Sequence, residues 1–518
     1  MSTTFTLINA DTDQAIRTIA NGEVLDYAKL PTRNLTIRAD VSSDVGAESV
    51  VFGLDGNARF KIESDEPYSI VGDDGLNYRP WTPSTGSHQL TLTPYTGNKA
   101  TGNALASTTI SFQVVDTATT PAPEPEPEPN PNPNPNPPTD PDDATYKSAF
   151  TITKGGTYSG NYQSLSASTP VITIATSEPV VIENAILRGK SHLIVVKDGV
   201  KANVTIRNVQ GYGMNPDVDG KYPGRFLFAN SFAKVDIQHN YMESTSGIYL
   251  FGAADGASVK VMYNEAKNID GRMSAGPGKW RQPGTDSTKS DTSFYRVQFF
   301  QINQCVLDGG AEIAWNKVVN EAGKSRVEDN ISIHRTKGTS SNPIRIHDNY
   351  IDGAYPLNWQ TGKFSGGGII VDGGWSDSRG EAGYVKIYNN TVISTSNYGI
   401  AIAAGHDSQI YNNRVVSTGK VDGTGVRSGN VGIYIRNHAY RNGKEPAGHF
   451  YNNYAYDNVV GWLKADGTHN EYYMPDDDGD KSVNNQKLSG SITEATEQAE
   501  YTRWLSKVDA ANVMVGLA

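Results

Sequence analysis

The sequence predicts an all-β protein in which a small β-sandwich is followed by a long coil of stacked short strands. Three observations lead to this prediction. Proline occupies every second position of a central segment, apolar and polar residues alternate before that segment, and the phrase Tyr-Asn-Asn returns three times after it. We therefore expect a sandwich over residues 1–118, a proline-rich spacer over 119–144, and a coil over 145–518 that ends in a helix.

The first module contains several short strands separated by turn signals. Residues 48–62 alternate as two strands about the Asp-Gly-Asn sequence at 55–57, which is the pattern of a hairpin. Residues 88–98 and 107–116 alternate in the same way. Through "LINADTDQAI" near its start and "NYRPWTP" further on, the module resembles the immunoglobulin-like modules of secreted bacterial proteins. That resemblance implies a spacer or carbohydrate-binding role without chemistry.

The spacer reads "PAPEPEPEPNPNPNPNPPTDPDD" at 121–143. Proline at every second position excludes a helix and a regular strand ladder and favours extended polyproline II. We expect this segment to separate the two modules and to make no stable contacts. Such spacers resemble those of secreted multidomain carbohydrate-active proteins.

The Tyr-Asn-Asn phrase belongs to a longer repeat in the second module. Seven segments share an apolar residue followed three positions later by Asn, and a second set of alternating four-residue segments, such as "IIVD" and "IYIR", lies between them. Two short strands per turn, repeated many times, indicate a solenoid of about nine or ten turns. The repeated asparagines are Asn240, Asn264, Asn316, Asn349, Asn390, Asn413 and Asn453.

These asparagines have an architectural explanation. We expect each to lie at the bend after a strand, where asparagine tolerates left-handed geometry, and to stack on its neighbours in a ladder of side-chain amides. The repeat resembles the right-handed parallel β-helix family of secreted polysaccharide-active proteins, which includes lyases. Residues 491–513 have helical apolar spacing, so we predict an amphipathic helix that packs on or near the C-terminal end of the coil.

Composition limits the classes of partner. The 518 residues carry 45 Lys and Arg against 56 Asp and Glu, a formal net charge of −11. We do not expect nucleic acid as a partner, whereas a local basic cleft for an anionic polysaccharide is compatible with an acidic chain. The sequence contains no apolar run of the roughly 18 residues that a membrane span needs. We expect a monomer in which the single cysteine, Cys305, is buried.

The first residues, "MSTTFTLINADTDQ", contain neither the basic nor the apolar region of a signal peptide. Either the protein is cytosolic or a signal has been removed from the sequence. The proline-rich spacer favours the second alternative, so we expect a secreted or cell-surface protein.

The second set of strands indicates which side chains point outward. In "GIIVDGG", Ile369 and Val371 are expected to face the interior, so Asp372 faces solvent. The same offset puts His334 and Arg436 outward on nearby turns, with the small residue Ala403 between them as a gap that fits a sugar subsite. On these strands or just after them lie the candidate catalytic residues His334, Arg335, Lys337, Asp372, Arg436 and His438.

Insertions between the turns are expected to supply substrate contacts. The longest gap in the asparagine series contains Lys279, Trp280 and Arg281, a ring that can stack on a sugar between two cations that can hold a carboxylate or sulfate. A second insertion carries Trp359. We add His406 and Asp407, which follow a strand of the second set, to the candidate substrate-binding residues.

Two acidic loops resemble calcium-binding sequences. The first supplies Asn215, Asp217 and Asp219, and the second supplies Asp476, Asp478 and Asp480. Carboxylate and amide oxygens at alternate positions are the ligands that Ca²⁺ prefers. The sequence therefore predicts Ca²⁺ as a candidate cofactor.

Three functions fit this sequence, and all of them take a polysaccharide as partner. The first is a polysaccharide lyase that cleaves a uronic-acid polymer by β-elimination, in which a cation neutralises the carboxylate and a side chain removes the C5 proton. The second is a glycoside hydrolase with two carboxylates, Asp372 with Asp407 or Asp377; "GHD" and "YIRN" resemble stretches of the polygalacturonase family, whose paired-Asp motifs are absent. The third is a non-catalytic binding protein or adhesin.

Overall fold

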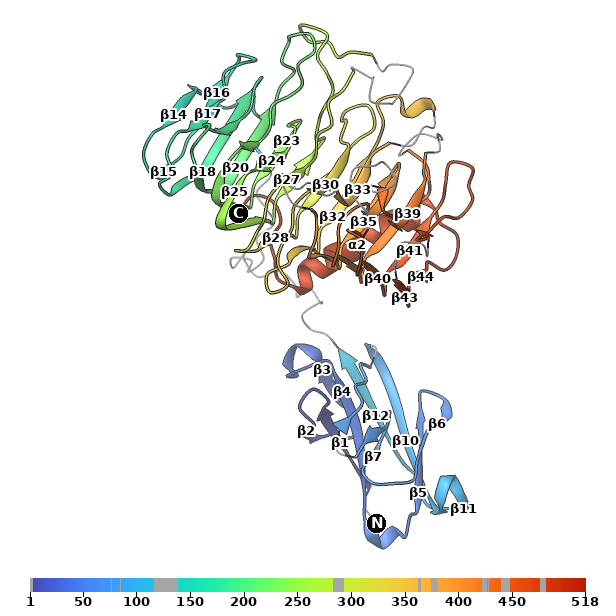
Figure 1. Ribbon diagram of the computed structural model, residues 1–518. Coiled ribbons are helices and arrows are strands. Elements are labelled where there is room, and N and C mark those ends of the chain that lie inside the picture. The colour runs from blue at the N-terminus through green and yellow to red at the C-terminus, as the bar shows by residue number, and fades with distance from the viewer. Residues whose placement is uncertain are drawn as a thin grey trace. The chain divides into compact units, whose positions relative to one another are not determined.

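The computed structural model describes residues 3–75, 77–83, 85–115, 138–282, 293–361, 365–373, 381–421, 426, 428–438, 448–475 and 481–518. The chain divides into two compact units, Met1–Pro129 and Asn130–Ala518. Both are built mainly from strands (Figure 1). Within these ranges no helix has the length and apolar content needed to cross a membrane.

Two larger sheets with one shared core form the first unit, together with a two-stranded sheet of β8 (Asp73–Asp74) and β9 (Asn77–Tyr78). The predicted hairpin is confirmed: β5 (Ser49–Leu54) and β6 (Asn57–Glu63) pair antiparallel around Asp55 and Gly56, which both have positive φ. The predicted pair at 88–116 is also confirmed as β10 (Gly86–Gly97) and β12 (Thr108–Val115). Strand β3 (Glu23–Asp26) pairs with β12, and β11 (Thr101–Ala104) with β10. The other sheet has the order β2 (Gln14–Thr18), β1 (Thr3–Asn9), β4 (Leu35–Val41), β7 (Tyr68–Ser69).

The second unit contains a sheet of 11 strands in which every neighbouring pair is parallel. Each strand pairs with the strand one turn further along the chain, so the chain returns to the same side at every turn. This arrangement is consistent with a parallel β-helix. The strands are β14 (Phe150–Ile152), β17 (Ile172–Ile174), β19 (Ile194–Val196), β21 (Leu227–Ala229), β24 (Ile248–Phe251), β27 (Phe300–Asn303), β30 (Asp329–His334), β33 (Gly367–Asp372), β36 (Tyr398–Ile402), β39 (Val431–Ile435) and β42 (Tyr472–Tyr473).

A sheet of 21 strands covers the remaining sides of the same coil, again with parallel pairs one turn apart. Its strands are β13 (Lys147–Ser148), β15 (Gly156–Tyr158), β16 (Tyr162–Ser164), β18 (Val180–Gly189), β20 (Ala202–Gly213), β22 (Phe232–Gln238), β23 (Tyr241–Glu243), β25 (Ala253–Met262), β26 (Glu265–Lys267), β28 (Ala311–Ala314), β29 (Lys317–Val319), β31 (Ile344–His347), β32 (Tyr350–Ala354), β34 (Val385–Tyr388), β35 (Thr391–Thr395), β37 (Gln409–Tyr411), β38 (Arg414–Ser417), β40 (Tyr454–Tyr456), β41 (Val459–Trp462), β43 (Lys481–Val483) and β44 (Gln486–Lys487).

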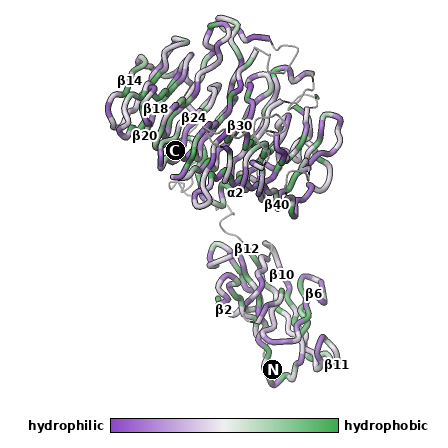
Figure 2. Tube along the Cα trace, viewed as in Figure 1, coloured by the Kyte–Doolittle hydropathy of each residue, from purple (hydrophilic) through white to green (hydrophobic). Residues whose placement is uncertain are grey.

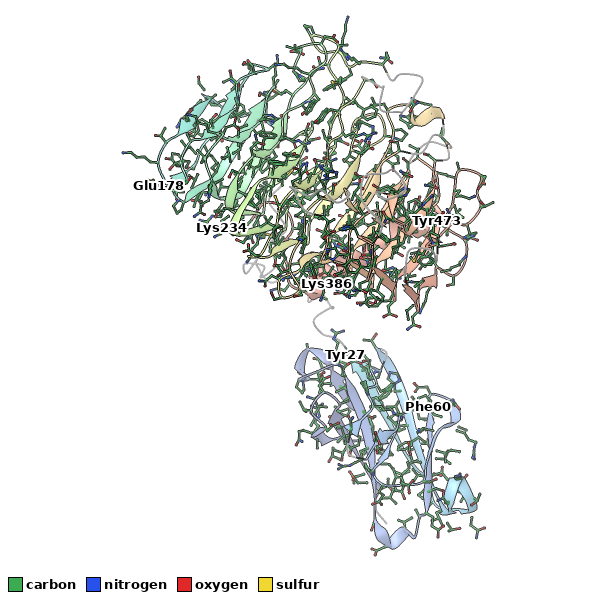
Figure 3. The ribbon with its side chains drawn as sticks, in the orientation of Figure 1. Tyr27, Phe60, Glu178, Lys234, Lys386 and Tyr473 are labelled. Carbon is green, nitrogen blue, oxygen red and sulfur yellow. The ribbon has the colours of Figure 1, made fainter. Side chains whose placement is uncertain are left out.

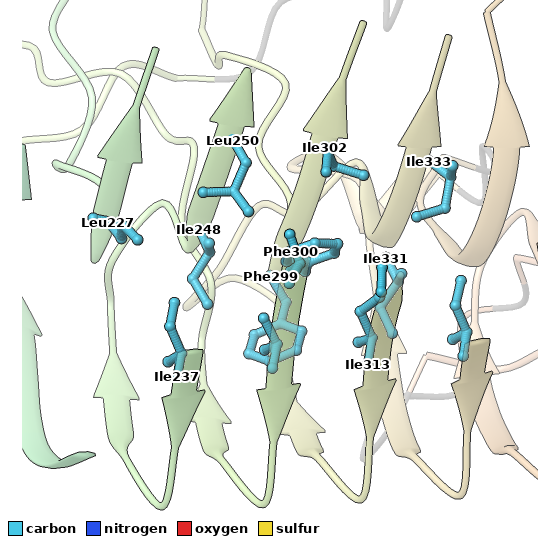
Figure 4. Packing of buried hydrophobic residues seen from close by; sticks show 14 of the residues in the cluster. Leu227, Ile237, Ile248, Leu250, Phe299, Phe300, Ile302, Ile313, Ile331 and Ile333 are labelled. Atoms are coloured by element: carbon cyan, nitrogen blue, oxygen red, sulfur yellow. The ribbon is translucent and has the colours of Figure 1, made fainter. Parts of the chain in front are cut away.

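The core lies inside the coil and consists of stacked apolar side chains. Hydrophobic and hydrophilic residues alternate along the strands (Figure 2), so each strand sends every second side chain inward. Ile248, Phe300 and Ile331 follow one another on β24, β27 and β30 (Figure 4), and none has measurable exposure. Cys305 is buried at the edge of this core, as predicted.

A ladder of buried asparagine amides runs along one bend of the coil. The Asn390 Nδ2 group donates to Asn413 Oδ1 over 3.0 Å, and Asn349 donates to Asn390 over 2.9 Å. Six of the seven predicted members are confirmed. The seventh is wrong, because Asn413 donates to Asn458, which donates in turn to Asn485. The full series is Asn240, Asn264, Asn316, Asn349, Asn390, Asn413, Asn458 and Asn485.

The three Tyr-Asn-Asn copies therefore do not have one role. In the first two copies the tyrosines stack, with the ring centroids of Tyr388 and Tyr411 4.9 Å apart. The left-handed conformation belongs to the first asparagine, Asn389 or Asn412, and not to the ladder residue that follows it. In the third copy Tyr451 stacks instead on His406, on a different side of the coil.

The predicted C-terminal helix is present. Helix α2 (Glu494–Ala510) begins at a capping box on Thr493 and packs along the side of the coil. Trp504 Nε1 donates to the Asp348 carbonyl, and Arg414 forms an ion pair with Glu500. The chain then continues to earlier turns, where the Ala518 amide donates to Asn208. Apolar surface on the bends beside β35 and β38, rather than at the last turn, attracts the helix.

We expect stability to depend on the ion pairs of Asp348 beneath α2. Burial raises the pKa of Asp348, but hydrogen bonding to His347 and the ion pair with Lys507 outweigh burial, so its pKa lies below the ordinary value. A depressed folded-state pKa contributes stability above the unfolded-state pKa of about 3.9, and this contribution disappears as the pH falls through the folded value. Asp348→Asn should therefore cost about 2 kcal/mol at neutral pH and nothing at acidic pH.

Denaturant unfolding of Asp348→Asn and wild type at a series of pH values measures this difference. Asparagine is suitable because Asp348 has positive φ, which asparagine tolerates. Asp255→Asn is the control, since Asp255 is exposed and has no hydrogen bond or ion pair to the described part of the chain. An equal loss at all pH values would contradict the assignment.

The end of the spacer differs from expectation. Residues 138–143 contact strands of the coil, because the Thr139 amide donates to Gln210 and Asp142 forms an ion pair with Arg188. The Tyr212 hydroxyl also donates to the Thr139 carbonyl. The prediction that 121–143 makes no stable contacts is therefore wrong for its last six residues. The preceding prolines lie outside the described residues.

Candidate functional site

A cavity of about 810 Å³ lies on the outer face of the 11-stranded sheet. Strands β21, β24, β27, β30 and β33 form its floor, and residues around 222–225 and 294–298 form one side. Most of its lining is polar or aromatic. Its lining includes Tyr222, Arg225, Tyr249, Phe294, Tyr295, Arg296, Asn303, Glu328, Asp329, His334, Asp372 and Tyr398.

The strand register brings two of the predicted catalytic residues together. His334 aligns with Asn303 on one side and with Asp372 on the other, so these three side chains form one row across β27, β30 and β33. The Asp372 carboxylate has no hydrogen-bond or ion-pair partner among the residues that the structure describes. Both His334 and Asp372 line the cavity.

Arg436 lies on the same sheet beyond the cavity. Its amide donates to the Ile402 carbonyl, which places Arg436 in line with the row of His334 and Asp372, two turns beyond Asp372. Its guanidinium lies 5.5 Å from the ring centroid of Tyr473. The expected gap at Ala403 is not open. Ala403 is 2% exposed and packs in an apolar cluster with Tyr398 and Tyr434, which separates Arg436 from the cavity.

A chain of hydrogen bonds fixes the orientation of the His334 ring. The Asn303 amide donates to the Tyr249 hydroxyl over 3.2 Å, and its oxygen lies 2.9 Å from His334 Nδ1. With this amide orientation Nδ1 carries the proton of the neutral ring. The lone pair is then at Nε2, which suits His334 to accept a proton.

Arg225 is a buried cation at the side of the cavity. It is 3% exposed, its guanidinium donates to the Ser246 carbonyl over 2.5 Å, and it lies 5.4 Å from the ring centroid of Tyr249. Burial lowers its pKa, although a guanidinium stays charged. Across the described ranges no carboxylate lies within 4 Å of it. A buried cation without a carboxylate favours an anionic ligand.

Acidic groups lie at the N-terminal end of β30. Burial and the charge of Glu328 raise the pKa of Asp329 to about 7, and the Tyr398 hydroxyl donates a hydrogen bond to its carboxylate. Glu328 is held by Arg326, whose Nη2 lies 2.6 Å from Glu328 Oε2 and whose guanidinium lies 4.0 Å from the ring centroid of Phe294. The Asp329 carboxyl group therefore changes its protonation state near neutral pH.

The other predicted catalytic residues do not line the cavity. Arg335 has positive φ and its amide donates to the Asp372 carbonyl. Its backbone therefore helps to hold β30 and β33 in the register that aligns His334 with Asp372. Lys337 forms single parallel bridges to Val306 and Gly383, away from the 11-stranded sheet. His438 packs edge-on against Tyr434, beyond the apolar cluster.

The long insertion reaches the cavity with residues other than those predicted. Phe294, Tyr295 and Arg296 line it, and the rings of Tyr295 and Tyr222 stack with centroids 4.4 Å apart. In contrast, Arg281 forms an ion pair with Asp219, and the Lys279 carbonyl accepts a hydrogen bond from Asn215.

The predicted sugar-stacking rings have protein partners. The Trp280 ring is covered by the Arg272 guanidinium, 4.5 Å from its centroid. Trp359, in the short helix η5 (Trp359–Thr361), lies beside Gly323 and does not line the cavity.

His406 and Asp407 lie on another side of the coil. His406 is 3% exposed, with Nδ1 2.7 Å from Asp407 Oδ2 and Nε2 3.2 Å from Glu381 Oε1. It forms single bridges to Gly383 and Tyr451, in the same row as Lys337. Neither residue contacts the large cavity.

The first predicted calcium loop is occupied by protein contacts. Asp217 pairs with Lys190 over 2.5 Å and accepts from the Gly278 amide, while Asp219 pairs with Arg281. Asn215 bonds to Asp217 and Lys279 through its side chain. These carboxylates are neutralised by cations, so the loop as folded does not fit Ca²⁺. Asp476, Asp478 and Asp480 lie outside the described residues.

In comparisons with models of known protein families, with curated proteins and with solved structures, the chain has no match.

Proposed function

We propose that the second unit is a right-handed parallel β-helix and that the protein is a secreted enzyme that cleaves an anionic polysaccharide by β-elimination. The first unit would then be an immunoglobulin-like accessory module. The cavity on the 11-stranded sheet is the proposed active site. The observation that carries this proposal is Arg225, a buried guanidinium that faces the cavity without a carboxylate partner among the described residues.

Elimination requires a C5–H bond that is acidic enough to lose its proton, and Arg225 would increase that acidity. Its guanidinium would pair with the C6 carboxylate of a uronate and draw charge away from C5, so that the C5 proton becomes easier to remove. Carboxylate and guanidinium match as a planar pair. Aromatic rings from Tyr222 and Tyr295 offer a surface on which a neighbouring sugar can pack.

His334 and Tyr249 supply the proton transfers. His334 Nε2 takes the C5 proton, the C5–H electron pair forms the C4–C5 double bond, and the C4–O bond breaks. The Tyr249 hydroxyl, which accepts a hydrogen bond from Asn303 and retains its own proton, donates that proton to the departing oxygen. The products are an unsaturated uronate and a new sugar end, so atoms and electrons balance.

Polygalacturonate, alginate, ulvan and glycosaminoglycans are the polymers for the first test. We expect one of them to give ultraviolet absorbance from the conjugated double bond, together with new reducing ends. Its carboxyl methyl ester should react more slowly, because the ester cannot pair with Arg225. Absence of an unsaturated product with all four polymers would overturn elimination.

A specific observation favours hydrolysis as the second candidate. Asp329, with a pKa of about 7, and the unpaired Asp372 are two carboxylates in different environments, as an acid and a base require. Hydrolysis through protonated Asp329 should therefore fall above about pH 7. Reducing ends without ultraviolet absorbance would identify hydrolysis, and binding without either product would identify a non-catalytic protein. A calcium requirement stays a prediction.

A further inference from the structure

We propose that a second cavity, on the 21-stranded sheet, binds a single acidic sugar unit without cleaving it. This cavity has a volume of about 310 Å³, at the lower end of the roughly 300–1,000 Å³ of small-molecule sites. Its lining shares no residue with the large cavity. The residues that carry the proposal are Tyr384, Lys386, Asp407, Gln409, Asn452 and Tyr454.

Three of these residues form a row across adjacent turns. Lys386 on β34 aligns with Gln409 on β37, which aligns with Tyr454 on β40. The inward neighbours of this row, Ile387, Ile410 and Ala455, are fully buried, so the row faces outward. Lys386 is labelled in Figure 3. The coil thus presents a cation, an amide and a phenol side by side.

Asp407 is held rigidly beside this row. Its Oδ2 lies 2.7 Å from His406 Nδ1, and its Oδ1 accepts from Asn452 Nδ2 over 3.1 Å. His406 is in turn held between Asp407 and Glu381 and stacked on Tyr451. A carboxylate oxygen accepts more than one hydrogen bond, so Asp407 can still accept from ligand hydroxyls. This role explains why a buried histidine with two carboxylates is built into the bend.

Lys386 gives the cavity its preference for charge. In the described part of the chain its ammonium has no hydrogen bond or ion pair, although the protein has a net charge of −11. Amide and carboxylate groups that bond hydroxyls, and phenol rings that pack on C–H faces, are the groups that recognise a sugar. A free cation beside them selects a sugar with a carboxylate or sulfate.

Saturation-transfer NMR of the full chain with small glycosides tests the proposal. The probes are methyl α-D-galacturonide, the neutral methyl α-D-galactoside, and galactose 6-sulfate. We expect saturable millimolar binding of at least one acidic probe, about tenfold tighter than the neutral one. The stronger acidic probe identifies the anion as carboxylate or sulfate.

Lys386→Met should remove this preference, since it keeps the length of the side chain without its charge. Lys260→Met is the matched control, because Lys260 is an exposed lysine on β25 of the same sheet and lies outside the cavity. The binding is measured without catalysis, so failure of the elimination proposal would not affect this one. Unchanged binding in Lys386→Met, or no saturable binding of any probe to wild type up to about 50 mM, would overturn the proposal.

Discussion

Replacing His334 with alanine is expected to lower the rate of polymer cleavage at least about 100-fold, the low end of the effect of a lost acid–base group. His334 lies at the centre of the cavity row, and its Nδ1 is fixed 2.9 Å from Asn303 Oδ1. Without the imidazole the C5 proton has no positioned acceptor. Initial rates of unsaturated product formation on the active polymer measure the loss.

Two further variants separate chemistry from folding. His334→Gln keeps a hydrogen-bonding group beside Asn303 but cannot take a proton, so it should be as inactive as alanine. His239→Asn changes a histidine on a bend of the 21-stranded sheet, where asparagine tolerates the positive φ, and should keep full activity. Full activity in both His334 variants would exclude this histidine as the base.

Replacing Asn316 with alanine is expected to destabilise the second unit by about 3–5 kcal/mol. The Asn316 side chain accepts from the amide and the side chain of Asn264, and donates to the Val261 carbonyl and to Asn349. Alanine removes all four hydrogen bonds at a site with no measurable exposure. The buried amide of Asn264 would lose its acceptor, while the side-chain oxygen of Asn349 would keep only the backbone amide of residue 316 as a donor.

Guanidinium unfolding followed by circular dichroism measures this change. Asn203→Ala is the matched control: Asn203 lies on β20, outside the ladder, and its side chain has no hydrogen bond within the described ranges. We expect its stability to change by less than about 0.5 kcal/mol. A similar small change for Asn316→Ala would show that stacked apolar residues alone fix the register.

The repeat predicted most of the architecture because the physical constraint is itself periodic. One inward apolar pair per strand and one buried amide per turn must recur wherever the chain passes the same bend, so the sequence shows both. The prediction for Asn453 is wrong because the third Tyr-Asn-Asn sequence lies on a different side of the coil from the first two. The ladder residue there is Asn458, and Asn453 instead accepts from the Ser408 amide and donates to the Gly405 carbonyl.

The candidate site was less accessible to sequence reasoning. The strand offset identified His334 and Asp372 correctly as outward neighbours, because pleating alone determines this. Arg225 precedes its strand and Asp329 begins its strand, so the offset rule missed both. "GRFLFAN", in which arginine directly precedes an apolar strand, was the available signal for Arg225. The partners of Lys279, Trp280 and Arg281 depend on how two loops meet, which spacing does not encode.

The asparagine ladder also shows that the number of residues in a turn can vary while the position of its ladder asparagine in the coil stays fixed. Successive ladder residues are as few as 23 and as many as 52 residues apart, yet each amide meets the next at 2.8–3.0 Å. The extra residues form loops between successive ladder asparagines. One of these loops brings Phe294, Tyr295 and Arg296 to the cavity. Loops can therefore be replaced by engineering while the row of Asn303, His334 and Asp372 on the sheet stays in place. Recognition can diversify in this scaffold without disturbing the groups proposed to carry out the reaction.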